Sequence, residues 1–176
     1  MVKLLVKHVE KTMSSQNKIK LLLVDDEIDF LQAIAERLAL KDFDVIVASK
    51  GREAIAAAEK ELFDVAVVDF KMPGMDGTQV LKVLKKRHKY LEIIMLTGYA
   101  TVESAVECTK LGAFKYLEKP YDFEKLVEII KEAYEDRLKK KFEHNKKHME
   151  EIQKLSLRES PLGLLRALAH LDDEEK

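Results

Sequence analysis

The sequence has few residues of the kinds that cross-link or anchor a chain. Among its 176 residues there is one cysteine, Cys108, and there is no tryptophan. A single cysteine excludes an internal disulfide and a cysteine-rich metal site, and it favours a reducing, cytoplasmic setting. No apolar run approaches the roughly 20 residues of a membrane-spanning helix. We therefore expect a cytoplasmic protein with no membrane partner, in which Cys108 is a small buried residue.

The chain also has little net charge. Charged residues make up 36% of the sequence, yet the formal net charge is -1. This balance gives no reason to expect a nucleic-acid or membrane partner. The basic run Arg137–Lys147 is followed by Glu150 and Glu151, which favours a solvated helix face over a DNA contact. Direct DNA binding is not expected.

Residues 18–137 alternate between short apolar runs and longer amphipathic runs. The short runs are typical of strands and the long runs of helices, which predicts an α/β fold with a doubly wound parallel sheet. Lys115 interrupts the last run, as in an edge strand. The expected strands are Ile19–Val24, Val45–Val47, Val65–Val68, Ile93–Leu96 and Phe114–Leu117.

Three of the expected helices have apolar residues at helical spacing, which predicts the faces that they bury. In the first, this face comprises Ile28, Leu31, Ile34, Ala35 and Leu38, and in the third it comprises Val80, Leu81 and Leu84. In the fourth, it comprises Val102, Ala105, Val106 and Thr109.

Polar residues follow four of the five expected strands. Asp25 and Asp26 follow the first strand, Asp69 the third, Thr97 the fourth, and Lys119 the fifth. Binding sites in such sheets lie at the carboxyl ends of the strands. We therefore expect these side chains to form one site.

The three aspartates indicate metal-assisted phosphoryl transfer. Asp25, Asp26 and Asp69 converge if the first and third strands are neighbours, and their mutual repulsion then favours a hard cation, Mg²⁺ or Mn²⁺. A carboxylate can act as a nucleophile and become an acyl phosphate. The cation and Lys119 would supply positive charge and Thr97 a hydroxyl group, and phosphoryl transfer depends mainly on such positioning and neutralisation.

Each residue also has a simpler interpretation on its own. Asp25 and Asp26 could cap the N-terminus of the following helix. Asp69 could be a turn residue before Pro73, Thr97 could be part of an ordinary loop, and Lys119 could be solvated. The coincidence of all four strand-end loops favours a functional site.

Four segments together resemble the receiver domain of response regulators in two-component signalling. They are VDDE at 24–27, DFKMPGMDG at 69–77, LTGYA at 96–100 and GAFKYLEKP at 112–120. The resemblance implies a flavodoxin-like five-stranded sheet of order 2-1-3-4-5, in a receiver domain that spans residues 18–137. It implies a single-domain type with two extensions, an N-terminal arm at 1–17 and a C-terminal helical extension at 138–176.

The resemblance assigns the phosphoryl group and the metal to particular residues. Asp69 is similar to the phosphoacceptor. Asp26, Asp69 and the backbone carbonyl of Lys71 are similar to direct ligands of Mg²⁺ (or Mn²⁺), and Asp25 to a ligand that acts through water. Lys119 is similar to the lysine that pairs with the phosphoryl group, and the family joins that lysine to the following proline by a cis peptide bond.

Thr97 and Tyr116 resemble the family's switch residues. The resemblance implies transfer to Asp69 from a sensor histidine kinase or a phosphotransfer protein. The output would be a phosphorylation-dependent contact with a downstream protein or a second copy. The contact surface would comprise the fourth helix, the fifth strand, the fifth helix and the C-terminal helix. The protein would not be an enzyme beyond catalysing its own phosphorylation and dephosphorylation.

Two alternative functions remain open on the sequence. One is an aspartyl-phosphate phosphatase, although its nucleophile would be expected on the first strand in a DxD pattern, whereas Asp25 and Asp26 are adjacent. The other is a receiver-like scaffold that is never phosphorylated, against which the complete set of acids argues.

The C-terminal extension carries a possible helix-pairing face. Leu138, Phe142, Asn145, Met149 and Ile152 have the 4-3-4-3 spacing of a heptad repeat. This spacing predicts a homodimer or a contact with a partner helix, and the alternative is a helix folded back on its own domain. His144 and His148 are expected to be ordinary surface residues. Tyr99, beside the site, is expected to shield the acyl phosphate from water.

Overall fold

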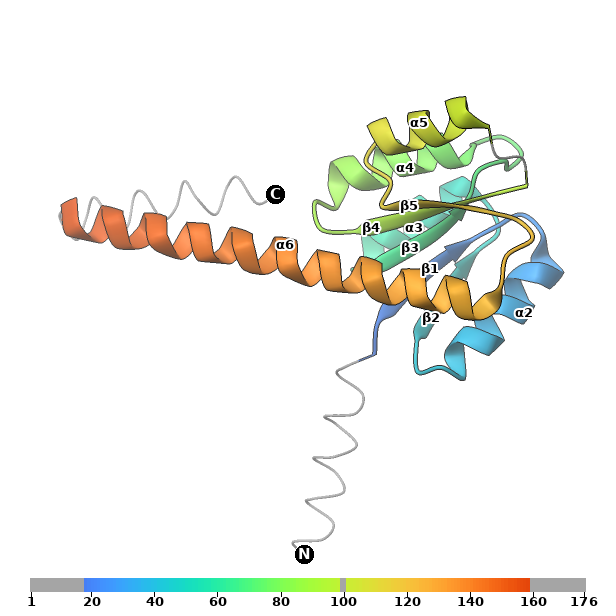
Figure 1. Ribbon diagram of the computed structural model, residues 1–176, viewed down its shortest axis with the longest axis horizontal. Helices are drawn as coiled ribbons and strands as arrows, with labels where there is room; N and C mark the ends of the chain where they lie inside the picture. The colour runs from blue at the N-terminus through green and yellow to red at the C-terminus, as the bar shows by residue number, and fades with distance from the viewer. Residues whose placement is uncertain (1–17, 99–100, 159–176) are drawn as a thin grey trace, which may run out of the picture. The chain divides into compact units, whose positions relative to one another are not determined.

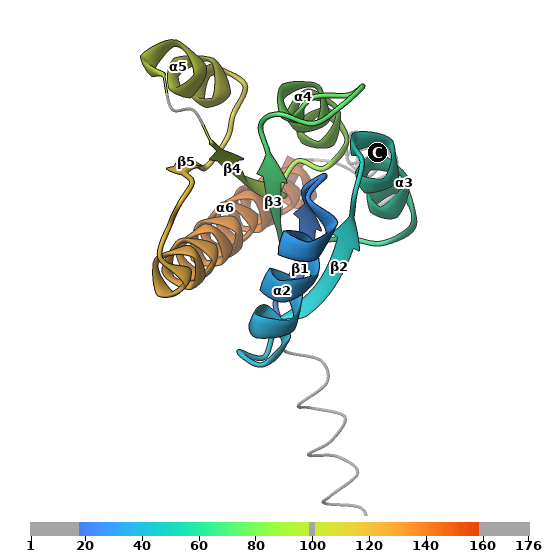
Figure 2. The same cartoon turned by 90° about the vertical axis from the view of Figure 1, so that its right-hand side faces the viewer.

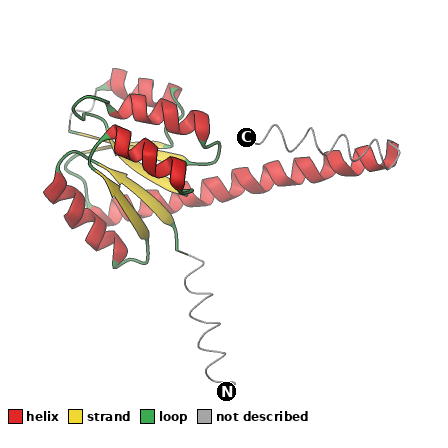
Figure 3. Cartoon of the chain, turned by 180° about the vertical axis from the view of Figure 1, so that it is seen from behind, coloured by secondary structure: helices red, strands yellow, loops and turns green. Residues whose placement is uncertain are grey.

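The computed structural model describes residues 18–98 and 101–158, with side chains up to Glu150 and that of Gln153. Strands and helices alternate along the described chain (Figure 1; Figure 3). The elements are β1 Lys20–Val24, α2 Ile28–Ala39, β2 Asp44–Ala48, α3 Gly51–Lys60, β3 Val65–Asp69, α4 Gly77–Arg87, β4 Glu92–Thr97, α5 Val102–Lys110, β5 Lys115–Glu118 and α6 Phe123–Arg158.

The five strands form one parallel sheet of order β2-β1-β3-β4-β5, which confirms the predicted fold. Strand β1 lies beside β3, with Val24 opposite Val68. The residues that directly follow Val24 therefore lie next to Asp69, the last residue of β3. The carboxyl ends of these two strands form the edge at which ligands bind in such sheets.

Helices cover both faces of the sheet (Figure 2), and an apolar layer lies between the helices and the sheet on each face. Successive strand residues point to opposite faces, so β1 contributes to both layers. Leu21 and Leu23 pack with α2 and α6, whereas Leu22 and Val24 pack with α3 and α4. These side chains are almost fully buried. Burial of each contributes about 1.5–3 kcal/mol, so the central strands are the most firmly held part of the domain.

Strand β2 departs from the expectation of a buried strand. It lies at the margin of the sheet, and Val47 is 45% exposed. Its Val- and Ile-rich run is as apolar as that of β3, but only β1 pairs with it. Strand β5 forms the opposite margin, which confirms the prediction made from Lys115.

The predicted buried face of α5 is wrong. Val102 is 76% exposed and Val106 is 44% exposed, and with Ala105 and Thr109 they line a shallow apolar hollow. The helix packs instead through Cys108, which is fully buried as predicted. Because α5 lies against the four-residue margin strand β5, little sheet surface is available to cover its apolar residues.

The first helix shows a smaller difference. Leu31, Ile34 and Leu38 of α2 are buried as predicted, but Ile28 is 56% exposed. Ile28 is the first residue of the helix, beyond the part that covers the sheet.

Local signals explain where several helices begin and end. Asp76 forms a capping box with Gln79 at the start of α4. Asp122 accepts a hydrogen bond from the backbone N–H of Lys125 at 3.1 Å, as an N-cap residue does at the start of α6. Gly112 follows the end of α5 with a φ of 87°, a conformation that favours glycine.

Two units are distinguished along the chain, Met1–Arg137 and Leu138–Lys176, and α6 contributes residues to both. The predicted continuation of the last helix beyond Arg137 is confirmed, since α6 extends to Arg158. None of the described helices is long and apolar enough to cross a membrane. The predicted arm at 1–17, Tyr99, and the sequence from Glu159 onward lie outside the described residues, so the domain bounds remain predictions.

Candidate functional site

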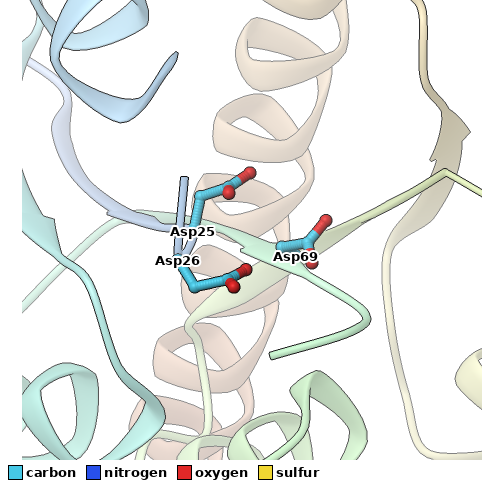
Figure 4. Close-up of side chains that lie close together, drawn as sticks. All are labelled: Asp25, Asp26 and Asp69. Atoms are coloured by element: carbon cyan, nitrogen blue, oxygen red, sulfur yellow. The ribbon is translucent and has the colours of Figure 1, made fainter. Parts of the chain in front are cut away.

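Three carboxylates meet at the carboxyl end of the sheet (Figure 4). One oxygen from each of Asp25, Asp26 and Asp69 lies within 4.8 Å of the others. Asp25 and Asp26 directly follow β1, and Asp69 ends β3. The pairing of these two strands thus brings together residues that are more than forty positions apart in the sequence.

Asp25 and Asp69 are buried, whereas Asp26 is exposed. Buried carboxylates require hydrogen-bond donors. Asp25 accepts from the backbone N–H of Glu27 at 3.0 Å, and Asp69 accepts from the backbone N–H of Lys71 at 3.0 Å. The N-cap residue of α2 is Glu27, and no side chain caps this helix. The interpretation of Asp25 and Asp26 as simple helix caps is therefore wrong.

Lys119 places its ammonium group between the two buried acids. Its Nζ atom lies 2.6 Å from Asp25 and 2.9 Å from Asp69. Glu27 is further away, at 3.7 Å. Burial disfavours the charged ammonium, but the hydrogen bonds to Asp25 and Asp69 outweigh this effect and raise the pKa of Lys119. The site thus contains a permanent cation beside the Asp69 carboxylate.

Opposing effects act on the pKa of the Asp69 carboxyl group. Burial is the largest effect and raises the pKa of its carboxyl group, while the hydrogen bond and charge of Lys119 lower it. The neighbouring charge of Asp25 raises it again, and the net shift is upward. A further cation near the three acids would favour the ionised form of Asp69, which is the nucleophilic form.

Thr97 and Tyr116 lie on neighbouring strands. Thr97 is buried at the end of β4, and its backbone carbonyl accepts a hydrogen bond from the N–H of Lys119 at 2.6 Å. In the strand register Tyr116 is opposite Met95, so Tyr116 and Thr97 are on the same face of the sheet. The Tyr116 hydroxyl is 2.8 Å from the Ser104 hydroxyl, which links β5 to α5.

Gly77 allows the loop after β3 to close against Asp69. A Cβ atom at this position would lie 2.2 Å from the backbone oxygen of Asp69 and 2.9 Å from the Cα of Phe70. The N–H of Gly77 donates to the carbonyl of Phe70 at 3.0 Å. Only glycine permits this approach, which places the start of α4 directly behind the site.

Two aromatic residues beside the site were missed on the sequence. The Nζ atom of Lys119 lies 4.8 Å from the ring centroid of Phe30, at the start of α2. Tyr121 meets Phe30 edge to face, with ring centroids 6.3 Å apart. Burial raises the pKa of Tyr121 to about 12, and its hydroxyl has no hydrogen-bond partner among the described residues. Their only sequence signal is that Tyr121 follows Lys119-Pro120 and Phe30 is one helical turn after Asp26.

The Lys119–Pro120 peptide bond is cis, in agreement with what the family resemblance implies. The donor set also fits a hard cation, because all three side chains offer carboxylate oxygen. Among the side chains that the structure describes, this is the only group of acids, histidines and cysteine that could hold a metal. His144 and His148 stack with their ring centroids 6.4 Å apart on α6. The described chain brings no third ligand to them.

Known proteins are similar to this chain in sequence and in fold. A sequence profile described as "Response regulator receiver domain" matches residues 21–131. The transcriptional regulatory protein ZraR of Salmonella typhimurium is 35% identical over 118 residues, which are 67% of this chain and 27% of ZraR. The regulatory protein AtoC of Escherichia coli is 35% identical over 126 residues, which are 71% of this chain and 27% of AtoC. This chain thus spans about a quarter of the length of these relatives.

A solved structure gives the same result at the level of the fold. The response regulator receiver domain protein (CheY-like) from Methanospirillum hungatei JF-1 superimposes with a TM-score of 0.68 and 33% sequence identity. The match covers 70% of this chain and 99% of that protein. The similarity therefore extends over the whole of that receiver domain.

Proposed function

The chain belongs to the response regulator receiver domain family, and from this membership we propose that Asp69 accepts a phosphoryl group in two-component signalling. The donor would be a sensor histidine kinase or a phosphotransfer protein. The observation that carries the proposal is the position of Asp69. It is buried at the end of β3, within reach of Asp25 and Asp26 and 2.9 Å from the Lys119 ammonium.

The chemistry follows from these positions. An oxygen of the ionised Asp69 carboxylate attacks the phosphorus atom of a phosphohistidine. A new P–O bond forms while the P–N bond breaks, and its electron pair remains on the imidazole. Lys119 offsets the negative charge on the transferred group, because its ammonium already lies beside Asp69.

The acidic cluster supports a metal in the same reaction. Mg²⁺ (or Mn²⁺) held by Asp25, Asp26, Asp69 and the Lys71 carbonyl would supply further positive charge beside the phosphoryl group. In this structure the Lys119 ammonium supplies part of this positive charge, because it bridges Asp25 and Asp69. Asp25 would be among the residues that hold the metal, and Lys119, which is already 2.9 Å from Asp69, would pair with the phosphoryl oxygens.

The output would be a change of surface. In the proposed switch, the Thr97 hydroxyl donates a hydrogen bond to the phosphoryl group, and Tyr116 changes its orientation at the same time. The Tyr116 hydroxyl is hydrogen-bonded to the Ser104 hydroxyl, so movement of Tyr116 would change the contact between β5 and α5. Phosphorylation would then shift the population between two surface states. The surface comprises α5, β5 and α6, and it would bind a downstream protein or a second copy.

The chain would act in the cytoplasm and would catalyse only its own phosphorylation and dephosphorylation. Direct DNA binding is not part of the proposal, although ZraR is named a transcriptional regulatory protein.

Incubation of the full chain with acetyl phosphate and Mg²⁺ tests the phosphoacceptor role. The wild type should be labelled, and Asp69→Asn should fold but remain unlabelled. Asp76→Asn is the matched control, because it removes a carboxylate from the same loop while asparagine still caps α4. Equal labelling of Asp69→Asn and the wild type would contradict the proposal, and equal labelling in excess EDTA would contradict the metal.

The phosphatase alternative is separated by a second assay. A generic phosphoester such as p-nitrophenyl phosphate should not be turned over by the wild type. Turnover that is lost in Asp69→Asn would assign the site to hydrolysis of an external substrate.

A further inference from the structure

The second unit presents an apolar seam along α6, which we define as Leu138, Phe142, Asn145 and Met149. These residues recur at the 4-3-4 spacing of heptad positions d, a, d and a. Leu138 is 45% exposed, Phe142 is 70% exposed and Met149 is 64% exposed. Large apolar side chains with this spacing and exposure form one face on a helix, which favours contact with another helix.

The flanks of the seam are basic. Positions e and g border a heptad seam and face the corresponding positions of a paired helix. The e positions carry Lys139, Lys146 and Gln153, and the g positions carry Lys141 and His148. The acids of this part of α6 lie outside the flanks, at Glu143, Glu150 and Glu151. Over the described residues 138–153, therefore, no flanking position is acidic.

This distribution opposes pairing with a second copy. In a parallel pair, Lys141 at g would face Lys146 at e of the partner helix. In an antiparallel pair, e faces e and g faces g, so lysines again face lysines. Like charges across such a seam destabilise the pair in both orientations. The homodimer expected from the heptad spacing alone is thus disfavoured by the residues beside the seam.

We propose that the α6 seam binds a partner helix with an apolar stripe and acidic flanks, rather than a second copy of this chain. Glutamate or aspartate at the partner's e and g positions would pair with Lys139, Lys141 and Lys146. Asn145 within the seam would favour one register, as a polar residue in a heptad seam does. This inference gives the chemistry of the downstream partner, and it rests on the proposed function only for its place in signalling.

The first test is the association state of the unphosphorylated full chain, measured by analytical ultracentrifugation at low salt. The wild type should be monomeric. Lys139→Glu/Lys146→Glu should dimerise as a parallel pair, because the glutamate at e position 146 would then face Lys141 at g of a second copy, and the two lysines at e would no longer be present. Lys140→Glu/Lys147→Glu changes the net charge equally at the outer f positions and should remain monomeric. A wild-type dimer that Phe142→Gln dissociates would overturn the proposal, as would a Lys139→Glu/Lys146→Glu variant that stays monomeric.

The second test uses two synthetic helical probes. One has the sequence of residues 135–155 with Lys139→Glu, Lys141→Glu and Lys146→Glu, and the other has the native sequence. The full chain should bind the acidic probe, and Phe142→Gln should weaken this binding more than about tenfold. The native probe should not bind. Equal binding of both probes would overturn the proposal.

A further outcome of the second test concerns the chain's own acidic end. Failure of the acidic probe to bind the full chain would also overturn the proposal, and it would point to the chain's own residues Asp172–Glu175 as the occupant. None of these measurements requires phosphorylation, so their outcome is separate from the labelling of Asp69.

Discussion

Lys119 is held by charges on one side and by an aromatic face on another. Its ammonium contacts Asp25 and Asp69, and the ring centroid of Phe30 lies 4.8 Å away. The two carboxylates would also be ligands of a bound metal, whereas the aromatic face of Phe30 would remain available to the ammonium. We therefore expect Phe30 to keep the ammonium in the site when a metal is bound.

A substitution at Phe30 tests this positioning role. A cation–π contact contributes about 0.5–2 kcal/mol. Phe30→Leu keeps apolar volume but removes the aromatic face, so labelling by acetyl phosphate should slow about 2- to 30-fold. Phe30→Trp should restore the rate. Ile28→Ala, on the same helix but exposed, should leave it unchanged. Equal rates for Phe30→Leu and the wild type, at equal thermal stability, would contradict the role.

His88 gives a pH dependence that is separate from the site. Burial and the charge of Arg87 lower the pKa of this histidine at the end of α4. The unfolded chain, in which His88 has a pKa of about 6.5, therefore binds the proton more readily than the folded chain. The stability due to neutral His88 is present above about pH 6.5 and is lost as the pH falls. Urea unfolding should show the wild type weakening relative to His88→Asn between about pH 7.5 and 5.5.

At the scale of elements, the fold can be predicted from the sequence because each strand is short, apolar and followed by a turn. That pattern predicts the sheet and the residues at its carboxyl edge. It does not predict how much sheet surface a given helix covers, and this explains the exposed face of α5, where Val102 is 76% exposed. Phe30 was missed for a related reason. Its contact with Lys119 depends on the angle at which α2 crosses the sheet, and no residue spacing records that angle.

The approach of α4 to β3 gives a stability prediction. Gly77→Ala should destabilise the domain by about 1–3 kcal/mol, because the added methyl group would overlap the Asp69 carbonyl. It should also slow phosphorylation by displacing Asp69. Gly98→Ala is the control, since a Cβ atom there meets no atom of the described residues within 4 Å, and its effect should be below about 0.5 kcal/mol. Chemical denaturation of both variants measures the difference, and equal stabilities would contradict the close approach.

At the scale of the whole molecule, the proposed signal passes from Asp69 through Thr97 to β5 and α5. Thr97→Ala should still be labelled at Asp69 but should fail to reach the active surface state. In NMR spectra recorded before and after phosphorylation, the wild type should show shifts around Tyr116 and Ser104, and the variant should not. Wild-type shifts confined to the acidic pocket would contradict a switch along this route.

The central claim is that Asp69 carries the phosphoryl group, and locating that group on the chain tests it most directly. The full chain would be treated with acetyl phosphate and Mg²⁺, reduced with borohydride to trap the acyl phosphate, and analysed by peptide mass spectrometry. The account predicts that the trapped residue is Asp69, and that Asp25, Asp26 and the other acids are unmodified. Trapping at a different residue, with Asp69 intact, would contradict it.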